Sequence, residues 1–114
     1  MNEINIRPWG KYEILLDQDN TKVKKITVNP GQKSSYQFHK KRDEYWIITK
    51  GELTIVLNNK KTTVKYGEFK FIPRESHHRA INNTNDFVEF IEVQTGLYFG
   101  EDDISRLQDD YGRS

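Results

Sequence analysis

Hydrophobic and polar residues alternate in short runs along most of this chain, which is the pattern of strands that bury one face. Residues 44–49 and 53–57 are rich in β-branched, aromatic and aliphatic side chains. The alternation predicts nine strands, at residues 12–16, 22–28, 34–39, 44–49, 53–57, 62–66, 69–72, 78–81 and 87–94. Many short strands in series are typical of a sandwich or a barrel, so we expect an all-β fold.

Turn-forming residues separate these runs. Asn58-Asn59 lies between the runs at 53–57 and 62–66 and predicts a hairpin there, because asparagine tolerates the positive φ of a tight turn. The one helix that we expect is a short C-terminal segment at residues 102–110, whose acidic start suits a helix N-terminus. No internal repeat or linker divides the series, so we expect a single domain over residues 1–114.

The composition excludes several classes of protein. Lys and Arg number 18 against 17 Asp and Glu, so the formal net charge of +1 favours neither a nucleic acid nor a membrane surface. Cysteine is absent, which excludes disulfides, thiolate metal ligands and a cysteine nucleophile. No apolar run is long enough to span a bilayer or to act as a signal peptide, so we expect a cytoplasmic location.

Four residues with oxygen or nitrogen donors are spaced so that strands would bring them together. Gln37 and His39 are two residues apart on one expected strand and therefore share a face. Glu44 opens the next strand, where an antiparallel return would place its carboxylate beside His39, and His78 begins a later strand. The set suits one divalent ion, with zinc first and manganese, iron, nickel or cobalt as alternatives. In a simpler interpretation, His39 only hydrogen-bonds to Glu44 and Gln37 lies at the surface.

The spacing of these residues extends into a two-part pattern with glycines and a proline. The two parts are Gly31-x5-Gln37-x-His39-x4-Glu44-x6-Gly51 and Gly67-x5-Pro73-x4-His78-x3-Asn82. The pattern resembles the cupin superfamily, which implies a double-stranded β-helix, a jelly-roll-like barrel. It departs from the usual cupin pattern at Gln37, where many cupins have histidine, and at Glu75, where glycine is usual.

The Gln-x-His variant is similar to the phosphomannose isomerases, whose metal is held by Gln, His, Glu and His. Residues 7–13, 22–26 and 91–104 are also similar to the C-terminal cupin domain of type II mannose-6-phosphate isomerases. The resemblance implies a metal-dependent isomerase of mannose 6-phosphate and fructose 6-phosphate, in nucleotide-sugar and polysaccharide precursor synthesis. In that family a mannose-1-phosphate guanylyltransferase domain often precedes this one. A separate guanylyltransferase is therefore an expected partner.

The substrate phosphate needs cations, and the sequence offers a few. Lys24 shares a strand face with Ile26, so an inward ammonium is one of two open orientations. Arg79 matches the family and would meet the phosphate at the rim, although strand alternation turns it away from the metal. The basic turn at residues 40–42 is a further candidate, in place of a turn that is His-rich in the family. The sequence does not identify the general base.

Two other functions remain open alongside the isomerase. A non-catalytic, metal-holding carbohydrate-binding or regulatory cupin would have the same ligands, because one fold hosts many functions. A cupin dioxygenase fits less well, because such enzymes use more histidine ligands than three histidines readily provide. A terminal strand at residues 7–16 would leave an edge open, and this edge together with the resemblance to cupins predicts a homodimer.

Overall fold

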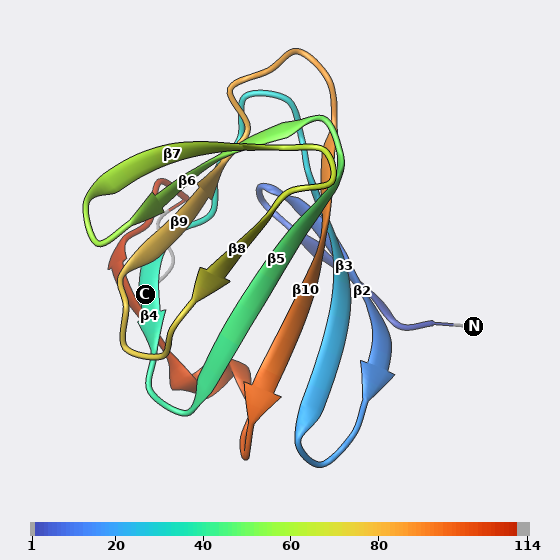
Figure 1. Cartoon of the computed structure of the whole chain (residues 1–114), viewed down its shortest axis with the longest axis vertical. Helices are drawn as coiled ribbons and strands as arrows, with labels where there is room; N and C mark the ends of the chain where they lie inside the picture. The colour runs from blue at the N-terminus through green and yellow to red at the C-terminus, as the bar shows by residue number, and fades with distance from the viewer. Residues whose placement is uncertain (1, 112–114) are drawn as a thin grey trace.

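The computed structural model describes residues 2–111, which form two antiparallel sheets facing each other across a shared interior (Figure 1). The first sheet has six strands, in the order β1 (Ile4–Arg7), β2 (Gly10–Asp17), β3 (Thr21–Val28), β10 (Val88–Gly96), β5 (Arg42–Lys50) and β8 (Phe69–Ile72). The second has five, in the order β11 (Ile104–Gln108), β4 (Tyr36–His39), β9 (His78–Ile81), β6 (Glu52–Leu57) and β7 (Lys60–Lys65). The expected cupin double-stranded β-helix is confirmed.

The nine expected strands all occur, with ends that differ by a few residues. The hairpin of β6 and β7 is confirmed: Leu53 pairs with Val64, and the turn residues Asn58 and Asn59 have φ of 48° and 68°. Positive φ at both central positions is what a type I′ turn requires. The strand β1 was not expected. Its residues pair with β2, which moves the free edge of the sheet from β2 to β1.

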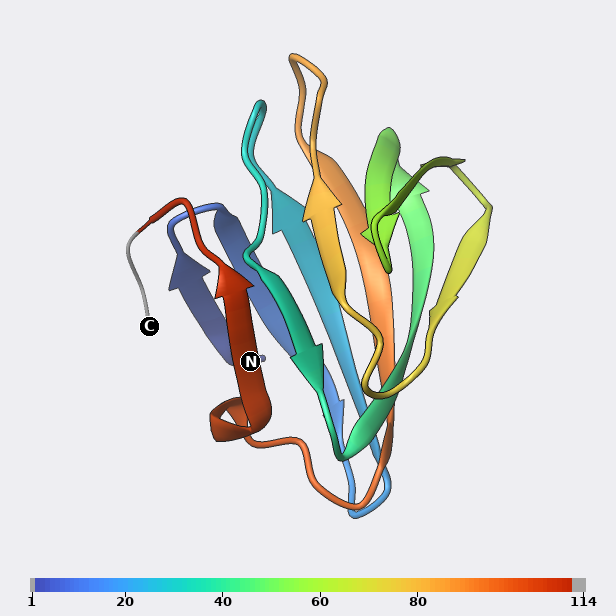
Figure 2. The ribbon, with the colours of Figure 1, turned by 90° about the vertical axis from the view of Figure 1, so that its left-hand side faces the viewer.

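The expected C-terminal helix at 102–110 is wrong. A short 3-10 turn at Glu101–Asp103 is followed by the strand β11, which pairs with β4 at the edge of the five-stranded sheet (Figure 2). The acidic start favoured a helix locally. However, pairing with β4 satisfies the backbone groups of an otherwise open edge and half-buries Ile104, so tertiary context overrides propensity. Within residues 2–111, no helix is long and apolar enough to cross a membrane.

The interior changes from apolar to polar along the strands of the larger sheet. On β10, the inward side chains are Val88 and Phe90 and then Glu92 and Gln94, all between 0% and 6% exposed. The partners on β3 and β5 follow the same order, because the register joins Phe90 to Ile48 and Glu92 to Lys24. The most deeply buried apolar side chains of the interior are Val28, Ile48, Leu53, Ile55, Ile72, Val88 and Phe90. The apolar half therefore supplies the packing that stabilises the fold, and the polar half is free to hold a site.

Asn82 of the second motif ties the end of β3 to the loop after β9. It is fully buried, and its Nδ2 donates to the carbonyl oxygens of Val28 and Asp86 at 3.0 and 2.8 Å. Its Oδ1 accepts a hydrogen bond from Thr84 N at 2.9 Å. Every polar atom of the amide thus has a partner, so Asn82 has a structural role.

The glycines of the two motifs occupy turns with left-handed backbone conformation. Gly31, Gly51 and Gly67 have φ of +72°, +77° and +83°, which side chains with a Cβ rarely adopt. Glu75, which stands where cupins usually have glycine, has φ of +69°. The structure therefore keeps the glycine-type backbone at this position and accepts strain of about 1–2 kcal/mol.

We expect Glu75→Gly to raise the free energy of unfolding by about 0.5–1 kcal/mol. Relief of the left-handed strain outweighs the extra backbone entropy of glycine in the unfolded chain. Glu75→Ala is the matched control and should leave stability nearly unchanged, because it removes the carboxylate but keeps the Cβ. Urea unfolding of the three proteins measures the effect. A Glu75→Gly protein less stable than Glu75→Ala would contradict this explanation.

Candidate metal site

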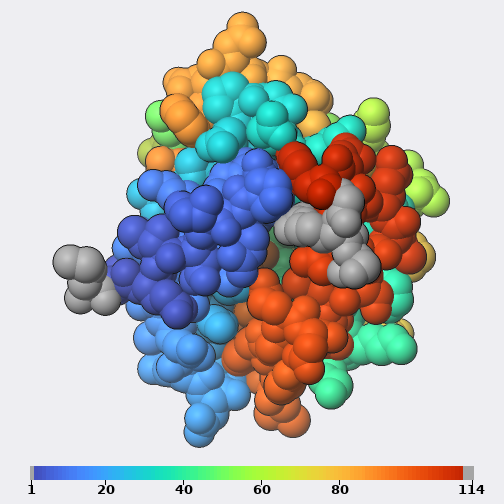
Figure 3. Space-filling model, turned by 180° about the vertical axis from the view of Figure 1, so that it is seen from behind, coloured from blue at the N-terminus to red at the C-terminus, as the bar shows by residue number. Residues whose placement is uncertain are grey.

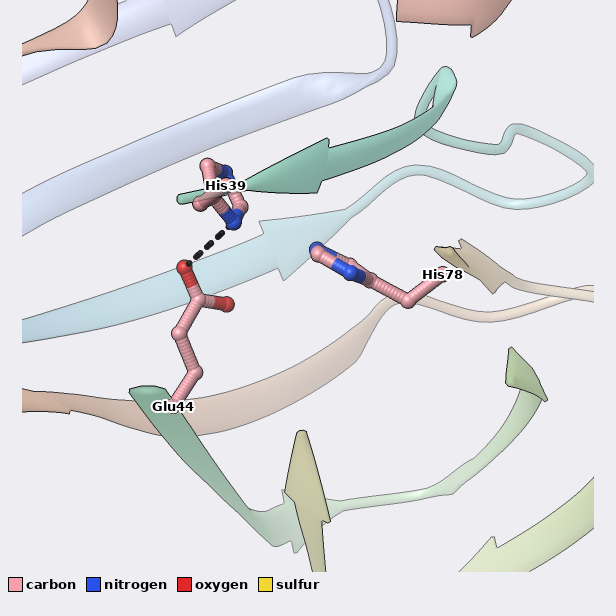
Figure 4. Close-up of side chains that lie close together, drawn as sticks. All are labelled: His39, Glu44 and His78. Atoms are coloured by element: carbon pink, nitrogen blue, oxygen red, sulfur yellow. Dashed lines mark ion pairs between the residues drawn. The ribbon is translucent and has the colours of Figure 1, made fainter. Parts of the chain in front are cut away.

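Three of the four expected ligands converge in the polar half of the interior (Figure 4). His39 ends β4, Glu44 lies near the start of β5 after a two-residue turn, and His78 is the first residue of β9. One potential ligand atom from each lies within 4.8 Å of the others, and all three side chains are at most 3% exposed. Strand ends from both sheets therefore place two imidazoles and one carboxylate around a common point.

Gln37, the fourth expected ligand, lines an interior cavity together with His39 and Glu44. It shares the inward face of β4 with His39, and its Cα pairs with that of His78 across β4 and β9. This register places Gln37 on the strand that carries His39, directly opposite His78.

The imidazole of His78 is oriented as in a metal ligand. Its Nδ1 lies 3.0 Å from the carbonyl oxygen of Ser76, so Nδ1 carries the hydrogen and Nε2 carries the free lone pair. Within the described residues, this buried Nε2 has no hydrogen-bond partner, and the ring lies 4.9 Å from that of His39. Burial lowers the pKa of His78 and lowers that of His39 to about 4, which keeps both rings in the neutral form that binds metal. The donor set therefore fits a divalent ion.

Arg42 is a site residue that the sequence analysis treated only as part of a basic turn. Its guanidinium Nε donates to Glu44 Oε2 at 2.8 Å, and an Nη lies 2.9 Å from His39 Nε2. Burial alone would raise the pKa of Glu44, but the neighbouring Arg42 guanidinium holds it well below its usual range. The sequence feature that could have identified Arg42 is its alternation with Glu44 and Trp46, which places all three side chains on one face of β5.

A second buried carboxyl, that of Glu92, faces the cavity from β10. Trp46 is buried, and its indole N–H lies between the two carboxyls, at 2.9 Å from Glu44 Oε1 and 3.1 Å from Glu92 Oε1. Gln94 Nε2 donates to the other oxygen of Glu92 at 2.7 Å. Burial and the nearby Glu44 raise the pKa of Glu92 to about 8.

Lys24 points into the cavity, which decides between its two open orientations. It is 3% exposed, and its Nζ lies 4.2 Å from the centre of the Tyr12 ring and 3.9 Å from Glu101 Oε2. Both ends of the chain help to form the wall: Arg7 comes from the N-terminal segment, and Glu101 and Arg106 come from the C-terminal one. Figure 3 shows these segments side by side on one face of the molecule, in blue and in orange to red.

Arg79 lies outside this cavity. Its Nε donates to Ser34 O at 2.7 Å and an Nη donates to Gln108 O at 3.2 Å, so the guanidinium holds β11 against the sheet. His77, two residues before Arg79, points to the outer face, where its ring lies 5.2 Å from that of Phe38. The structure therefore separates these two residues from the converging ligands.

Known proteins related to this chain are found by sequence and by fold. The family described as mannose-6-phosphate isomerase C-terminal matches residues 1–109. The alginate biosynthesis protein AlgA of Pseudomonas aeruginosa is 42% identical over 108 residues, which are 95% of this chain and 22% of that protein. A mannose-1-phosphate guanylyltransferase of Salmonella muenchen is 41% identical over 102 residues, covering 90% of this chain and 22% of the relative. The chain thus spans about a fifth of the length of these relatives.

Solved structures with low sequence identity share the fold. KdgF from Halomonas sp. superposes with a TM-score of 0.77 at 15% identity, covering 88% of this chain and 89% of that one. A Klebsiella pneumoniae protein with a double-stranded β-helix domain gives a TM-score of 0.73 at 20% identity, with coverage of 82% and 80%. The match over residues 1–109 shows that the chain belongs to the family of mannose-6-phosphate isomerase C-terminal domains, and the shared structure shows that it has the cupin fold.

Proposed function

We propose that this chain is a metal-dependent aldose–ketose isomerase that interconverts mannose 6-phosphate and fructose 6-phosphate. The observation that carries the proposal is the convergence of His39, Glu44 and His78, the first two of which line a cavity that also contains buried cations. The family match over residues 1–109 supports this substrate. The reaction would supply precursors for nucleotide-sugar and polysaccharide synthesis.

In this proposal, Gln37, His39, Glu44 and His78 hold one divalent ion, with zinc first and manganese, iron, nickel or cobalt as alternatives. When bound, the ion would act as a Lewis acid toward the substrate oxygens, which become negatively charged during isomerisation. Ser76 keeps His78 in the required tautomer, and Trp46 orients the Glu44 carboxylate.

The substrate phosphate would meet Lys24 and Arg42. Both side chains are buried, and both lie near the carboxylate of Glu101, at 3.9 and 3.5 Å. The Glu101 side chain is 43% exposed, so it is the partner that a phosphate dianion would most easily replace. Charge-assisted bonds from lysine and arginine would then fix the position of C1 and C2 in the cavity.

A non-catalytic, metal-holding sugar-binding or regulatory role is the second candidate. The observation in its favour is that Arg42 already neutralises Glu44 and contacts His39, so the cluster is stable without serving a reaction. An assay distinguishes the two roles.

The proposal extends to location and partner. We place the chain in the cytoplasm, beside a mannose-1-phosphate guanylyltransferase, whose mannose 1-phosphate differs from mannose 6-phosphate only in the position of the phosphate. Relatives with that name contain the region that matches this chain within a longer protein.

Metal content tests the ligand set. Protein purified without chelators should contain close to one divalent ion per chain, with donor atoms about 2.0–2.5 Å from the ion. His78→Ala should abolish the occupancy, because it removes the free Nε2, and elemental analysis measures the result. His77→Ala is the matched control and should keep the ion, because that ring packs on the outer face. Equal metal content in both variants would contradict the assignment.

Activity tests the reaction. The metal-replete protein should convert mannose 6-phosphate to fructose 6-phosphate and discriminate against unphosphorylated mannose. Lys24→Met should raise KM for mannose 6-phosphate by about tenfold or more, since it removes a charge-assisted bond to phosphate. Lys25→Met, which changes the next residue on the other face of β3, should leave KM unchanged. A folded, metal-replete wild type that binds sugar phosphate without isomerising it would favour the second candidate.

The homodimer expected from the sequence is also a proposal. Both edge strands of the six-stranded sheet have exposed apolar side chains, Ile4 and Ile6 on β1 and Phe69 and Phe71 on β8, at 41–72% exposure. Pairing of two copies would cover one of these edges. Light scattering at micromolar concentration should report twice the mass of the chain, and the mass of one chain would exclude the dimer.

A further inference from the structure

The isomerase reaction needs a group that carries a proton between C1 and C2, and the proposed ligands and phosphate partners do not provide it. This inference therefore rests on the proposed function. A carbon-bound proton can be taken only by a basic side chain that lies within the cavity, beside the substrate. The cavity-lining carboxylates are those of Glu44, Glu92 and Glu101.

Two of these three carboxylates have other partners. Glu44 belongs to the metal cluster and is bonded to Arg42. Glu101 is 43% exposed and lies near Lys24 and Arg42, where the phosphate is expected. Glu92 remains, and it is 6% exposed in the middle of the larger sheet.

Glu92 is buried without a bonded cation. Its oxygens accept hydrogen bonds from Trp46 Nε1 at 3.1 Å and from Gln94 Nε2 at 2.7 Å, and both donors are neutral. Within residues 2–111, no cationic nitrogen lies within 4.0 Å of its carboxyl group. Burying an ionised carboxylate without a bonded cation is unfavourable, and a carboxyl group in such an environment within a cavity is a candidate for proton transfer.

The same contacts place Glu92 between the metal cluster and Lys24. The indole N–H of Trp46 lies between Glu92 Oε1 and Glu44 Oε1, so the two carboxyl groups are neighbours. Lys24 pairs with Glu92 in the register of β3 and β10 and lies on its other side. A sugar phosphate held between the metal cluster and Lys24 would therefore have C1 and C2 beside Glu92.

We propose that Glu92 is the catalytic residue that moves the proton between C1 and C2. In its ionised form, the Glu92 side chain takes the proton from C2 of mannose 6-phosphate. The electron pair of the broken C–H bond forms the C1–C2 double bond, and the π pair of the C1 carbonyl moves to O1. Glu92 returns the proton to C1, and transfer of the hydroxyl proton from O2 to O1 completes fructose 6-phosphate. Atoms and electrons balance without a further reactant.

Hydrogen exchange with solvent tests this role in the full, metal-replete chain. Glu92→Gln should lower both isomerisation and deuterium incorporation from D2O by at least about a hundredfold, the range of general acid–base catalysis. Its metal content and its affinity for fructose 6-phosphate, measured by calorimetry, should stay within about threefold of wild type. Glu89→Gln is the matched control on the same strand, and it should exchange at the wild-type rate because Glu89 pairs with Lys25 outside the cavity.

Each alternative result overturns a distinct claim. Exchange by Glu92→Gln within tenfold of wild type would remove the role of Glu92 and leave the isomerase standing. Loss of metal or of sugar-phosphate binding in a folded Glu92→Gln protein would also overturn the catalytic role of Glu92, because Glu92 would then only stabilise the site. If Glu92→Gln fails to fold, Glu92→Asp is measured instead. An unchanged rate of isomerisation and exchange in Glu92→Asp overturns the proposal. A wild type without isomerisation or exchange overturns the proposed function and this inference together.

Discussion

The buried carboxylate of Glu44 determines how the polar half of the barrel is built. It is 1% exposed, and it needs partners that compensate for the loss of water. Arg42 and Trp46, two residues before and after it on β5, provide them at 2.8 and 2.9 Å. Removing one partner of such a buried pair typically costs about 3–5 kcal/mol. One buried charge therefore constrains three successive inward side chains of β5, those of Arg42, Glu44 and Trp46.

The constraint extends across the sheet through hydrogen bonds and register. Trp46 also donates to Glu92, and Gln94 fixes the far oxygen of that residue, so two strands share one polar layer. A polar layer of this kind is tolerated because the other half of the interior is apolar and fully packed. Leu53 and Ile55 from the smaller sheet are 0% exposed in that half. Stability and chemistry are thus separated along the strands.

Segments far apart in the sequence complete the site. The 3-10 turn at Glu101–Asp103 brings a carboxylate to Lys24 and Arg42, and Asp103 accepts hydrogen bonds from the backbone of the turn after His39. Arg79, although close to His78 in sequence, serves the opposite face by holding β11. The polarity of the cavity is consequently set by how the chain ends fold back as well as by the two motifs.

Local sequence determined much of this protein. Alternation gave the nine strands, Asn58-Asn59 gave the hairpin, and the spacing of His39, Glu44 and His78 indicated a cluster that the structure brings within 4.8 Å. These features depend on neighbours along the chain, where periodicity and turn dihedrals are sufficient.

Tertiary structure alone decided the rest. The segment predicted to be a helix became β11 because an open edge on β4 offered backbone partners. Glu92 and Lys24 acquired their place because β10 pairs with both β3 and β5. Such pairings join residues more than forty positions apart, and no local pattern encodes which strands meet or in which register.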